Sequence, residues 1–352
     1  MKRLEIIGGG PAGAGAALAA RGHYDRIIVY EAQDRLAAKP CGRGIPVLGD
    51  IGYEPPRSVV YHRIRRAIMY VDGELLFELR DVFNGYIVDK TGFLEGAFAS
   101  AGAEVVYGAK YNPGLGRVRV GGSSIEPSPG SALFAGGHPY YTGEKILAIQ
   151  YRLATSHFDD ADHLEIYFDT GILGYYYVFP AEPGTVDVGV GGFMDYKGLK
   201  TRLDRFIEQD ERLRDAKRLK LEGARIAAGG IAYGRIGGLE KIGEAAGYVL
   251  PLTGEGIRPS MLSGMAAAKS LAAGGDPRRG MEEEWITRAI KVQRRILEAV
   301  KGMEPKERRS LLKGLTPRVH AEVALGRLDK GVIARELASK PRLALRLLKL
   351  LG

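Results

Sequence analysis

The chain has 352 residues, of which 45% are apolar and 26% are charged, and this balance excludes a disordered protein. The single cysteine, Cys41, excludes an internal disulfide and fits a reducing cytoplasm, and no apolar run approaches the roughly 18 residues of a transmembrane helix. The net charge of +9 lies almost wholly in residues 301–352, which carry thirteen basic and five acidic side chains. The rest is close to neutral, so we expect no nucleic-acid partner. The histidines are scattered, so we expect no metal site either.

Residues 3–31 predict a strand, a glycine-rich turn, a helix and a second strand. The first strand leads into three consecutive glycines, and Pro11, whose φ is preset for the first helical turn, begins the helix. The second strand ends at Glu31, eighteen residues past Gly13. This spacing places a carboxylate where it can reach the hydroxyls of a ribose.

The glycines of this turn follow the pattern Gly8-x-Gly10-x-x-Gly13. In a dinucleotide site the first makes the tight turn, the second lets the backbone approach a pyrophosphate, and the third lets the helix pack close to the strand. The helix N-terminus then faces the phosphates, where its free N–H groups and its dipole favour an anion. The pattern therefore predicts a dinucleotide-binding unit, with Glu31 on the adenosine ribose.

The next segments predict a loop, a hairpin and a return to the first sheet. Residues 32–50 have the glycine and proline density of an ordered loop. Residues 56–80 alternate like antiparallel strands, with Asp72-Gly73 as the turn. Residues 85–106 are typical of a strand, a helix and a strand.

The remaining elements are short strands, a larger sheet and many helices. Residues 115–135 predict short strands, and residues 145–190 predict a larger antiparallel sheet. Residues 197–221 predict a charged amphipathic helix, and residues 242–275 again combine a strand, a glycine-rich loop and a small-residue helix. Residues 281–351 are almost wholly helical in pattern, with breaks predicted at Gly302, Pro305, Gly314, Pro317, Gly331 and Pro341.

Together these elements predict an α/β fold. A Rossmann-like, three-layer cofactor domain is interleaved with an antiparallel substrate sheet, and a C-terminal helical region follows. We assign residues 1–55, 81–140 and 225–280 to the cofactor domain, 56–80 and 141–224 to the substrate sheet, and 281–352 to the helical region.

Four stretches resemble the FAD-dependent geranylgeranyl reductases, within the wider group of flavoproteins built like para-hydroxybenzoate hydroxylase. The first is the glycine turn, and the second is KPCGRG (39–44), which resembles the cysteine loop beside the flavin ring. The third, GYYYVFP (174–180), is similar to the Y-x-W-x-F-P substrate motif of the family. The fourth, GEAAGYVLPLTGEGIRPSMLSG (243–264), is similar to the G-D-A-A-G … P-x-x-G-E-G-I block. The resemblance covers residues 1–275.

The resemblance implies that the chain binds FAD and acts on a prenyl chain. The implied cofactor-binding residues are Gly8, Gly10, Pro11, Ala12, Gly13, Glu31, Ala32, Lys39, Cys41, Gly42, Arg43, Gly44, Lys90, Glu244, Gly254, Glu255, Gly256 and Ile257. The implied catalytic residues are Cys41, Tyr175, Tyr177 and Phe179.

The chain departs from the family pattern at several of these positions. Tyr177 stands where tryptophan is usual, Glu244 stands where the family has aspartate, and Lys90 replaces an arginine, which removes the bidentate fork. Residues 135–137 read Ala-Gly-Gly where related hydroxylases carry Asp-Gly. This last change counts against a hydroxylase more than against a reductase.

Some of these residues also have structural interpretations. Tyr175, Tyr177 and Phe179 alternate on one strand and share a face, which is either the wall of a prenyl tunnel or the core of a sheet. Cys41 is either a flavin-side residue or a small buried apolar side chain. His138 and the two tyrosines at 140 and 141 either face the same cavity or lie in a surface loop.

The function that the resemblance implies is reduction of C=C bonds in geranylgeranyl groups, on a prenyl lipid or a prenyl diphosphate, in archaeal-type membrane lipid synthesis. No second glycine fingerprint follows a strand, so NADPH or a ferredoxin-like carrier would reduce the flavin transiently. Two alternatives stay open: a flavin monooxygenase or epoxidase on an apolar substrate, and a catalytically inactive flavin-fold module that binds prenyl lipid. The chain has only two asparagines and four glutamines, which indicates a thermophilic source.

The last twelve residues, 341–352, predict an amphipathic helix. Its apolar face either enters the acyl boundary of the inner membrane surface, so that the protein binds there peripherally, or docks on the protein body. The predicted basic face consists of Arg342, Arg346 and Lys349, and the apolar face of Leu343, Leu347, Leu350 and Leu351.

Overall fold

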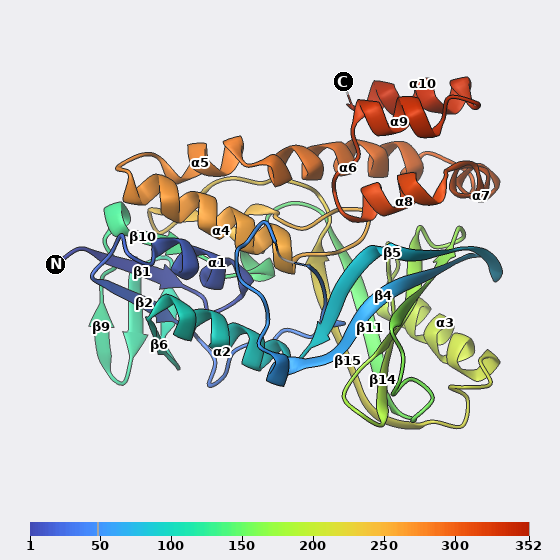
Figure 1. The fold of residues 1–352 in the computed structure, drawn as a ribbon. Coiled ribbons are helices and arrows are strands. Elements are labelled where there is room, and N and C mark those ends of the chain that lie inside the picture. Colours follow the sequence, from blue (N-terminus) through green and yellow to red (C-terminus); the bar gives the residue numbers. More distant parts are fainter. Residues whose placement is uncertain (48, 352) are drawn as a thin grey trace.

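The computed structural model describes residues 1–47 and 49–351, without the side chains of residues 82, 83, 342, 346 and 349–351. A six-stranded sheet lies at the N-terminal end of the molecule, and an eight-stranded sheet lies at the other end (Figure 1). Helices from the last third of the chain run along one side of both sheets (Figure 1). This architecture confirms the predicted α/β class.

The six-stranded sheet has the order β16-β17-β10-β1-β2-β6 and is parallel except for β16. Successive side chains of β1 lie on opposite faces of the sheet. Leu4 and Ile6 pack under helices α1, α2 and α4, and Ile7 packs toward the small sheet of β7, β8 and β9. These three layers confirm the Rossmann-like prediction. The bounds are β1 Arg3–Ile7, α1 Pro11–Ala20, β2 Arg26–Tyr30, α2 Lys90–Ala101, β6 Ala103–Val106, β7 Lys110–Asn112, β8 Arg117–Val120, β9 Ser123–Ile125, β10 Ala132–Phe134, β16 Arg235–Ile236, β17 Leu239–Lys241 and α4 Ile257–Ala272.

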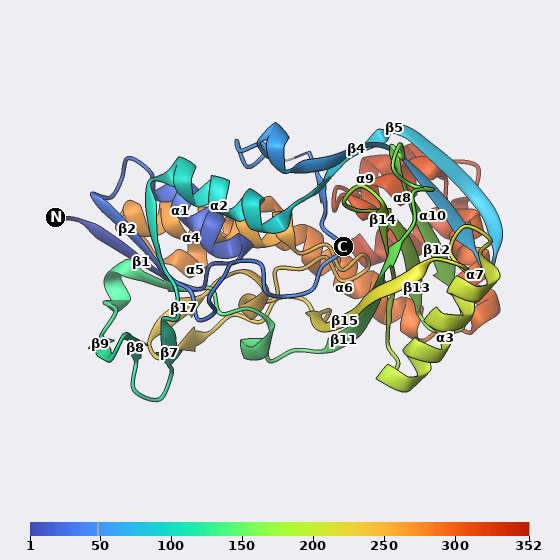
Figure 2. The ribbon, with the colours of Figure 1, turned by 90° about the horizontal axis from the view of Figure 1, so that it is seen from below.

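The eight-stranded sheet has the order β15-β11-β14-β13-β12-β4-β5-β3. The prediction was a purely antiparallel sheet. The sheet is instead mixed, because β12 pairs with β4 in parallel. Helix α3 covers one face, and α8 covers part of the other (Figure 2). The bounds are β3 Gly44–Pro46, β4 Val60–Val71, β5 Glu74–Val88, β11 Lys145–Ala154, β12 His163–Asp169, β13 Gly174–Pro180, β14 Thr185–Gly192, α3 Tyr196–Gln209, β15 Lys217–Ala227 and α8 Pro317–Ala324.

Two local predictions for this sheet have different outcomes. The hairpin turn at Asp72-Gly73 is confirmed, with φ of 47° and 83° at the two residues. The helix predicted over 197–221 is wrong in its second half, because α3 ends at Gln209 and β15 begins at Lys217. There the backbone pairs with β11 at the sheet edge, and this long-range pairing overrides the local charge pattern. Strand β5 is continuous through residue 81.

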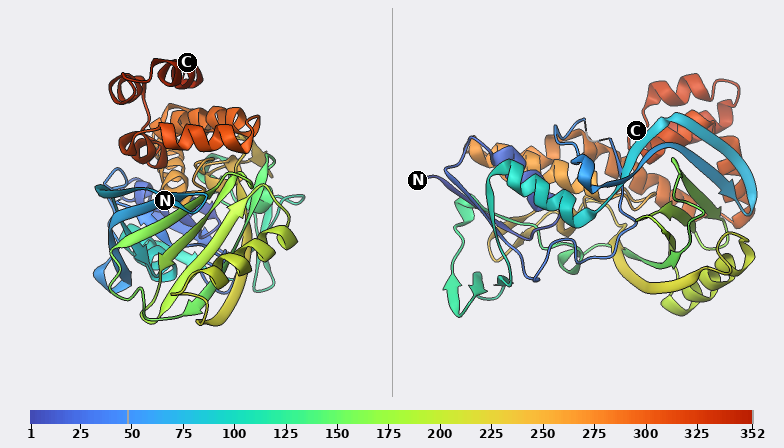
Figure 3. Two further views of the ribbon diagram at one scale, coloured as in Figure 1. Left: turned by 90° about the vertical axis from the view of Figure 1, so that its right-hand side faces the viewer. Right: turned by 60° about the horizontal axis from the view of Figure 1, so that its bottom comes forward.

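The C-terminal helices stack outward from the sheets, and α9 and α10 are outermost (Figure 3). Pro305, Pro317 and Pro341 begin α7, α8 and α10, as the predicted breaks require, but Gly331 lies inside α9. Among the described residues, no helix is long and apolar enough to cross a membrane. The remaining bounds are α5 Pro277–Glu283, α6 Trp285–Lys301, α7 Pro305–Gly314, α9 Lys330–Glu336 and α10 Pro341–Leu351, with short 3-10 turns at Arg57–Val59, Pro129–Ser131, His138–Tyr140 and Gly243–Ala246.

Candidate active site

A cavity of about 1430 Å³ lies between the two sheets and reaches the N-termini of α1 and α4. Ligand pockets usually enclose about 300–1,000 Å³, so this one has room for an extended cofactor together with a second ligand. All the predicted site residues except Gly13 line it: Gly8, Gly10, Pro11, Ala12, Glu31, Ala32, Lys39, Cys41, Gly42, Arg43, Gly44, Lys90, Tyr175, Tyr177, Phe179, Glu244, Gly254, Glu255, Gly256 and Ile257.

The glycine turn between β1 and α1 has the geometry that its pattern predicts. Gly8 has φ of +116°, and a Cβ built there would lie 2.4 Å from the carbonyl oxygen of Ala135. A Cβ on Gly13 would lie 2.3 Å from the carbonyl oxygen of Gly8, so Gly13 serves the packing of helix on strand rather than the cavity wall. Gly10 is different, since no atom lies within 4 Å of the Cβ position. Its open side faces the cavity, next to an α1 N-terminus that no side chain caps.

Glu31 closes this turn from the end of β2. Its carboxylate accepts hydrogen bonds from the backbone N–H of Gly9, at 2.8 Å, and of Gln33, at 2.9 Å. Both bonds fix the carboxylate beside the glycine turn on the cavity wall. The fold thus brings Glu31 to the glycine turn, although Glu31 and Gly9 are 22 residues apart in the sequence.

The N-terminus of α4 meets the cavity from the other side. The N-cap residue of α4 is Gly256, which has no side chain to cap the helix. Nearby, Gly254 has φ of +66°. Between them the Glu255 carboxylate accepts from the backbone N–H of Arg258, at 2.8 Å. Burial raises the pKa of Glu255. Two helix N-termini therefore point their N–H groups at one cavity, an arrangement that favours anionic or electron-rich ligand groups.

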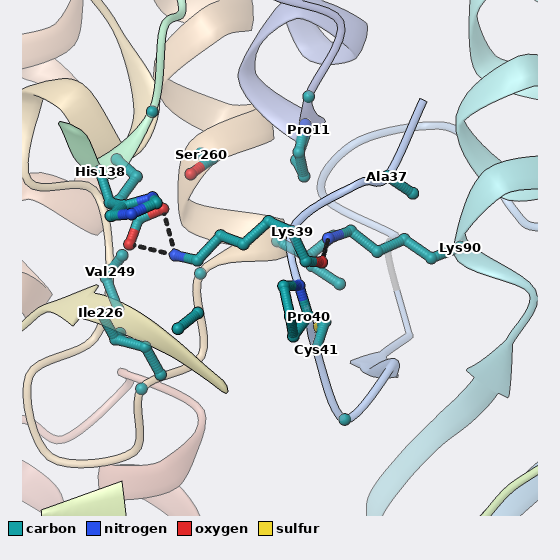
Figure 4. Close-up of a pocket in the computed structure, with 18 of the residues that line it drawn as sticks. Pro11, Ala37, Lys39, Pro40, Cys41, Lys90, His138, Ile226, Val249 and Ser260 are labelled. Atoms are coloured by element: carbon teal, nitrogen blue, oxygen red, sulfur yellow. Dashed lines mark hydrogen bonds and ion pairs between the residues drawn. The ribbon is translucent and has the colours of Figure 1, made fainter. Parts of the chain in front are cut away.

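Lys39 crosses the cavity to Glu244 (Figure 4). Its ammonium lies 2.6 Å from both carboxylate oxygens, one of which also accepts from the backbone N–H of Ala227, at 3.2 Å. Lys90 donates to the Lys39 carbonyl at 3.4 Å. Burial lowers the pKa of His138, which lies beside this pair, and the charge of Lys39 lowers it further. The carboxylate of Glu244 is therefore held by a lysine from the cysteine loop.

The cysteine loop places Cys41 and Arg43 differently. The half-buried Cys41 sulfur accepts from the Arg43 backbone N–H at 3.3 Å, and Cys41 lines the cavity. The Arg43 guanidinium is instead tied to Asp187, at 2.8 Å, and to Glu182, at 3.0 Å, and Arg152 binds the same two acids. Arg43 thus anchors the loop to the eight-stranded sheet, while its contact with a cofactor stays a prediction.

The aromatic residues of β13 form one wall of the cavity. Tyr175, Tyr177 and Phe179 face it, with ring centroids 6.5 and 4.7 Å apart, whereas Tyr176 and Val178 bury the opposite face under α3. Both cavity-facing tyrosines are half-buried, and burial raises the pKa of Tyr175 to about 12. Of the two interpretations of this strand, the cavity wall agrees with the structure.

The sequence comparisons point to one family. No family model matches the chain. A digeranylgeranylglycerophospholipid reductase from Thermoplasma volcanium is 27% identical over 310 residues, which cover 75% of this chain and 76% of that protein. A chloroplastic geranylgeranyl diphosphate reductase from Oryza sativa is 24% identical over 333 residues, 80% of this chain and 69% of that protein. The chain is thus similar, over three quarters of its length, to curated geranylgeranyl reductases.

Solved structures share the fold of this chain. A geranylgeranyl bacteriochlorophyll reductase-like protein from Thermoplasma acidophilum superposes with a TM-score of 0.81 at 21% identity, over 99% of each chain. A p-nitrophenol 4-monooxygenase from Pseudomonas putida gives a TM-score of 0.59 at 14% identity, over 100% of this chain and 99% of that one. The fold is thus common to flavoproteins of different chemistry.

The cavity also contains residues that the sequence motifs did not indicate. These are Gln150 of β11 and Glu222 of β15. Of the three residues for which a cavity or a surface loop was expected, His138 and Tyr140 line the cavity, whereas Tyr141 is buried and donates to the Gly230 carbonyl at 2.8 Å. Gln150 could have been found as the one amide in the apolar run ILAIQYRL. Glu222 gave no such signal, because it lies in a segment that was predicted to be near a helix end.

Proposed function

We propose that the protein is an FAD-dependent reductase that saturates C=C bonds of isoprenoid chains. The observation that carries the proposal is that one cavity joins the uncapped N-terminus of α1, the N-terminus of α4 and a glycine turn to an aromatic wall. The first part suits the pyrophosphate and flavin of FAD, and the second suits a long apolar chain. The names of the family relatives, which specify geranylgeranyl groups, support the choice of chain.

The residues present fit FAD. The open side of Gly10 leaves room for a phosphate, and Glu31 stands where a ribose hydroxyl pair would bind. The Gly254–Gly256 loop at the start of α4 would hold the flavin, and Glu244, already paired with Lys39, would lie along its ribityl chain. Reduced flavin supplies the hydride that no side chain can supply. The chain itself positions the substrate, excludes water and holds a proton donor.

The substrate that we propose is a geranylgeranyl group on a lipid or diphosphate carrier, as in the synthesis of archaeal-type membrane lipids. NADPH or a ferredoxin-like carrier would donate the electrons. Mass spectrometry of prenyl lipids incubated anaerobically with dithionite-reduced protein tests the proposal. We expect products that gain two hydrogens per reduced bond, and unchanged lipids would contradict it.

Two other functions make different predictions. A monooxygenase or epoxidase, a chemistry that the fold of the p-nitrophenol 4-monooxygenase allows, would consume O₂ in proportion to product and add oxygen to the lipid. A binding module without catalysis would give a colourless preparation that does not take up FAD. We expect a yellow protein whose product contains no added oxygen.

Replacing Cys41 by alanine should retain FAD and lower the turnover of prenyl lipid about tenfold or more, since a lost proton donor usually costs at least that much. Cys41 lies on the cavity wall in the loop that Arg43 anchors. Turnover and product distribution by mass spectrometry, with FAD content as the control, check this result. Unchanged turnover in the alanine variant would make Cys41 a packing residue.

We also propose reversible binding to anionic membranes through the basic C-terminal region. In α10, Ala344 and Leu347 are buried in a cluster with α6 and α9, so docking on the body accounts for part of the apolar face. Leu343 is half-buried in the same cluster, and the side chains of Arg342, Arg346, Lys349, Leu350 and Leu351 lie outside the described residues.

Liposome flotation tests this membrane proposal. We expect the full chain to float with anionic liposomes at low salt and to be released as salt rises, because each basic residue near the surface contributes about 1 kcal/mol that salt screens. A chain that ends at Lys340 should float less. Equal, salt-insensitive binding of both proteins, or no binding by either, would reject α10 as an anchor.

A further inference from the structure

One row of polar side chains, those of Tyr177, Gln150 and Glu222, crosses the cavity face of the eight-stranded sheet and lines the cavity. Tyr177 of β13 is directly opposite Gly189 of β14, which is opposite Gln150 of β11, which is opposite Glu222 of β15. A Cβ on Gly189 would lie 2.3 Å from the Tyr177 hydroxyl. The tyrosine ring can therefore lie across β14 and reach Gln150 only because position 189 has no side chain.

The hydrogen bonds of this row have one consistent direction. The Gln150 side-chain nitrogen donates to the Glu222 carboxylate at 2.9 Å and to the Cys41 carbonyl at 3.4 Å. A carbonyl and a carboxylate both act as acceptors here, and the Lys220 ammonium lies 2.5 Å from the Glu222 carboxylate. The Gln150 oxygen must then face Tyr177, and the tyrosine hydroxyl donates to it at 2.6 Å.

This direction commits the hydrogen of the Tyr177 hydroxyl to Gln150, within the cavity wall. The hydroxyl of Tyr175 is likewise tied, to the carbonyl of Thr253. Burial raises the pKa of Tyr177 well above its usual value, so the hydroxyl keeps its proton. Around these rings the wall is apolar, with Ile166 and Leu164 from β12 and Phe179 from β13. Both tyrosines therefore present ring carbons, rather than hydroxyls, to a ligand.

We propose that Gln150, oriented by Glu222, is a positioning residue that sets the specificity of the cavity for an apolar chain. It holds the Tyr177 hydroxyl in the wall and ties the same wall to the cysteine loop through the Cys41 carbonyl. The inference depends on the proposed function only for the choice of a prenyl chain as ligand.

A double-mutant cycle with Gln150→Leu and Tyr177→Phe tests this role, with binding of a C20 prenyl alcohol followed by fluorescence titration of the FAD-loaded protein. Gln150→Leu leaves a buried hydroxyl without its acceptor, and we expect binding about tenfold weaker. Tyr177→Phe should weaken binding about threefold. The double variant should bind more tightly than Gln150→Leu alone, because replacing both partners by apolar groups removes the unpaired hydroxyl.

Glu222→Gln tests the orientation separately, at a side chain near the sheet edge where folding is not at risk. The new amide can donate to Gln150 and allow it to turn, so we expect a smaller loss in the same direction as that of Gln150→Leu. FAD content and reductase turnover of the unmutated protein are measured in parallel. Absent turnover with the expected binding order would refute the proposed reaction but not this role.

Two results would overturn the role of Gln150. In the first, the double variant binds the alcohol as weakly as Gln150→Leu, or the unmutated protein does not bind it at all. In the second, Tyr177→Phe binds the alcohol but loses all turnover, which would make the hydroxyl a proton donor to the substrate rather than a group held out of its way.

Discussion

The Gly10→Val variant should purify without FAD. Gly10 has φ of −82° and ψ of −173°, an extended conformation that valine adopts without strain, and no atom lies within 4 Å of its Cβ position. The fold therefore tolerates the substitution, and the new side chain occupies the space that a phosphate needs at the start of α1. Flavin absorbance of the purified protein, with circular dichroism to show the fold, measures the effect.

Gly130→Val is the matched control for this variant. Gly130 is exposed, also has nothing within 4 Å of its Cβ position, and lies in the turn before β10, outside the cavity. We expect normal FAD content in this control. Normal FAD content in Gly10→Val would show that the glycine turn does not hold the pyrophosphate.

Replacing Asp187 by alanine should lower the free energy of unfolding by about 3–5 kcal/mol, because it removes the buried acid and leaves Arg43 and Arg152 to share Glu182 alone. The Asp187 side chain is 1% exposed and binds both Arg43 and Arg152 at 2.8 Å. The buried guanidinium of Arg43, held by Asp187 and Glu182, has its pKa raised, against the effect of burial. The loop that carries Cys41 should therefore lose its anchor as well.

Equilibrium urea unfolding measures this loss. Glu126→Ala is the control, since it removes an exposed ion pair with Arg117 at 3.1 Å, and such pairs contribute little. We expect its unfolding curve to lie close to that of the unmutated protein. If Asp187→Ala were no less stable than Glu126→Ala, Arg43 would not need its acids and would be free to serve the cavity.

The parts of the site that lie close in the sequence were predictable from it. The turn at Gly8, Gly10 and Gly13 depends on local backbone geometry, and the alternation of Tyr175, Tyr177 and Phe179 depends on the period of a strand. Both patterns are set by neighbouring residues. The helices that begin at Pro305, Pro317 and Pro341 were predictable for the same reason.

The parts that join distant segments were not predictable. Lys39 and Glu244 are 205 residues apart, and Gln150 and Glu222 are 72 residues apart. Their pairing depends on the sheet register and on the way the cysteine loop folds over the cavity, and no local pattern encodes either. Residues 217–221 show the same effect, because pairing with β11 turned a helix-like segment into an edge strand.

The mass of a prenyl lipid after a single turnover tests the central claim most directly. The FAD-loaded protein is reduced with a stoichiometric amount of dithionite under anaerobic conditions and mixed with a geranylgeranyl lipid, with the Gly10→Val variant as the control. We predict a product two hydrogens heavier, formed in proportion to the flavin reoxidised, and none with the variant. Reoxidation of the flavin only when O₂ is admitted, with the lipid unchanged or carrying an added oxygen atom, would contradict the account.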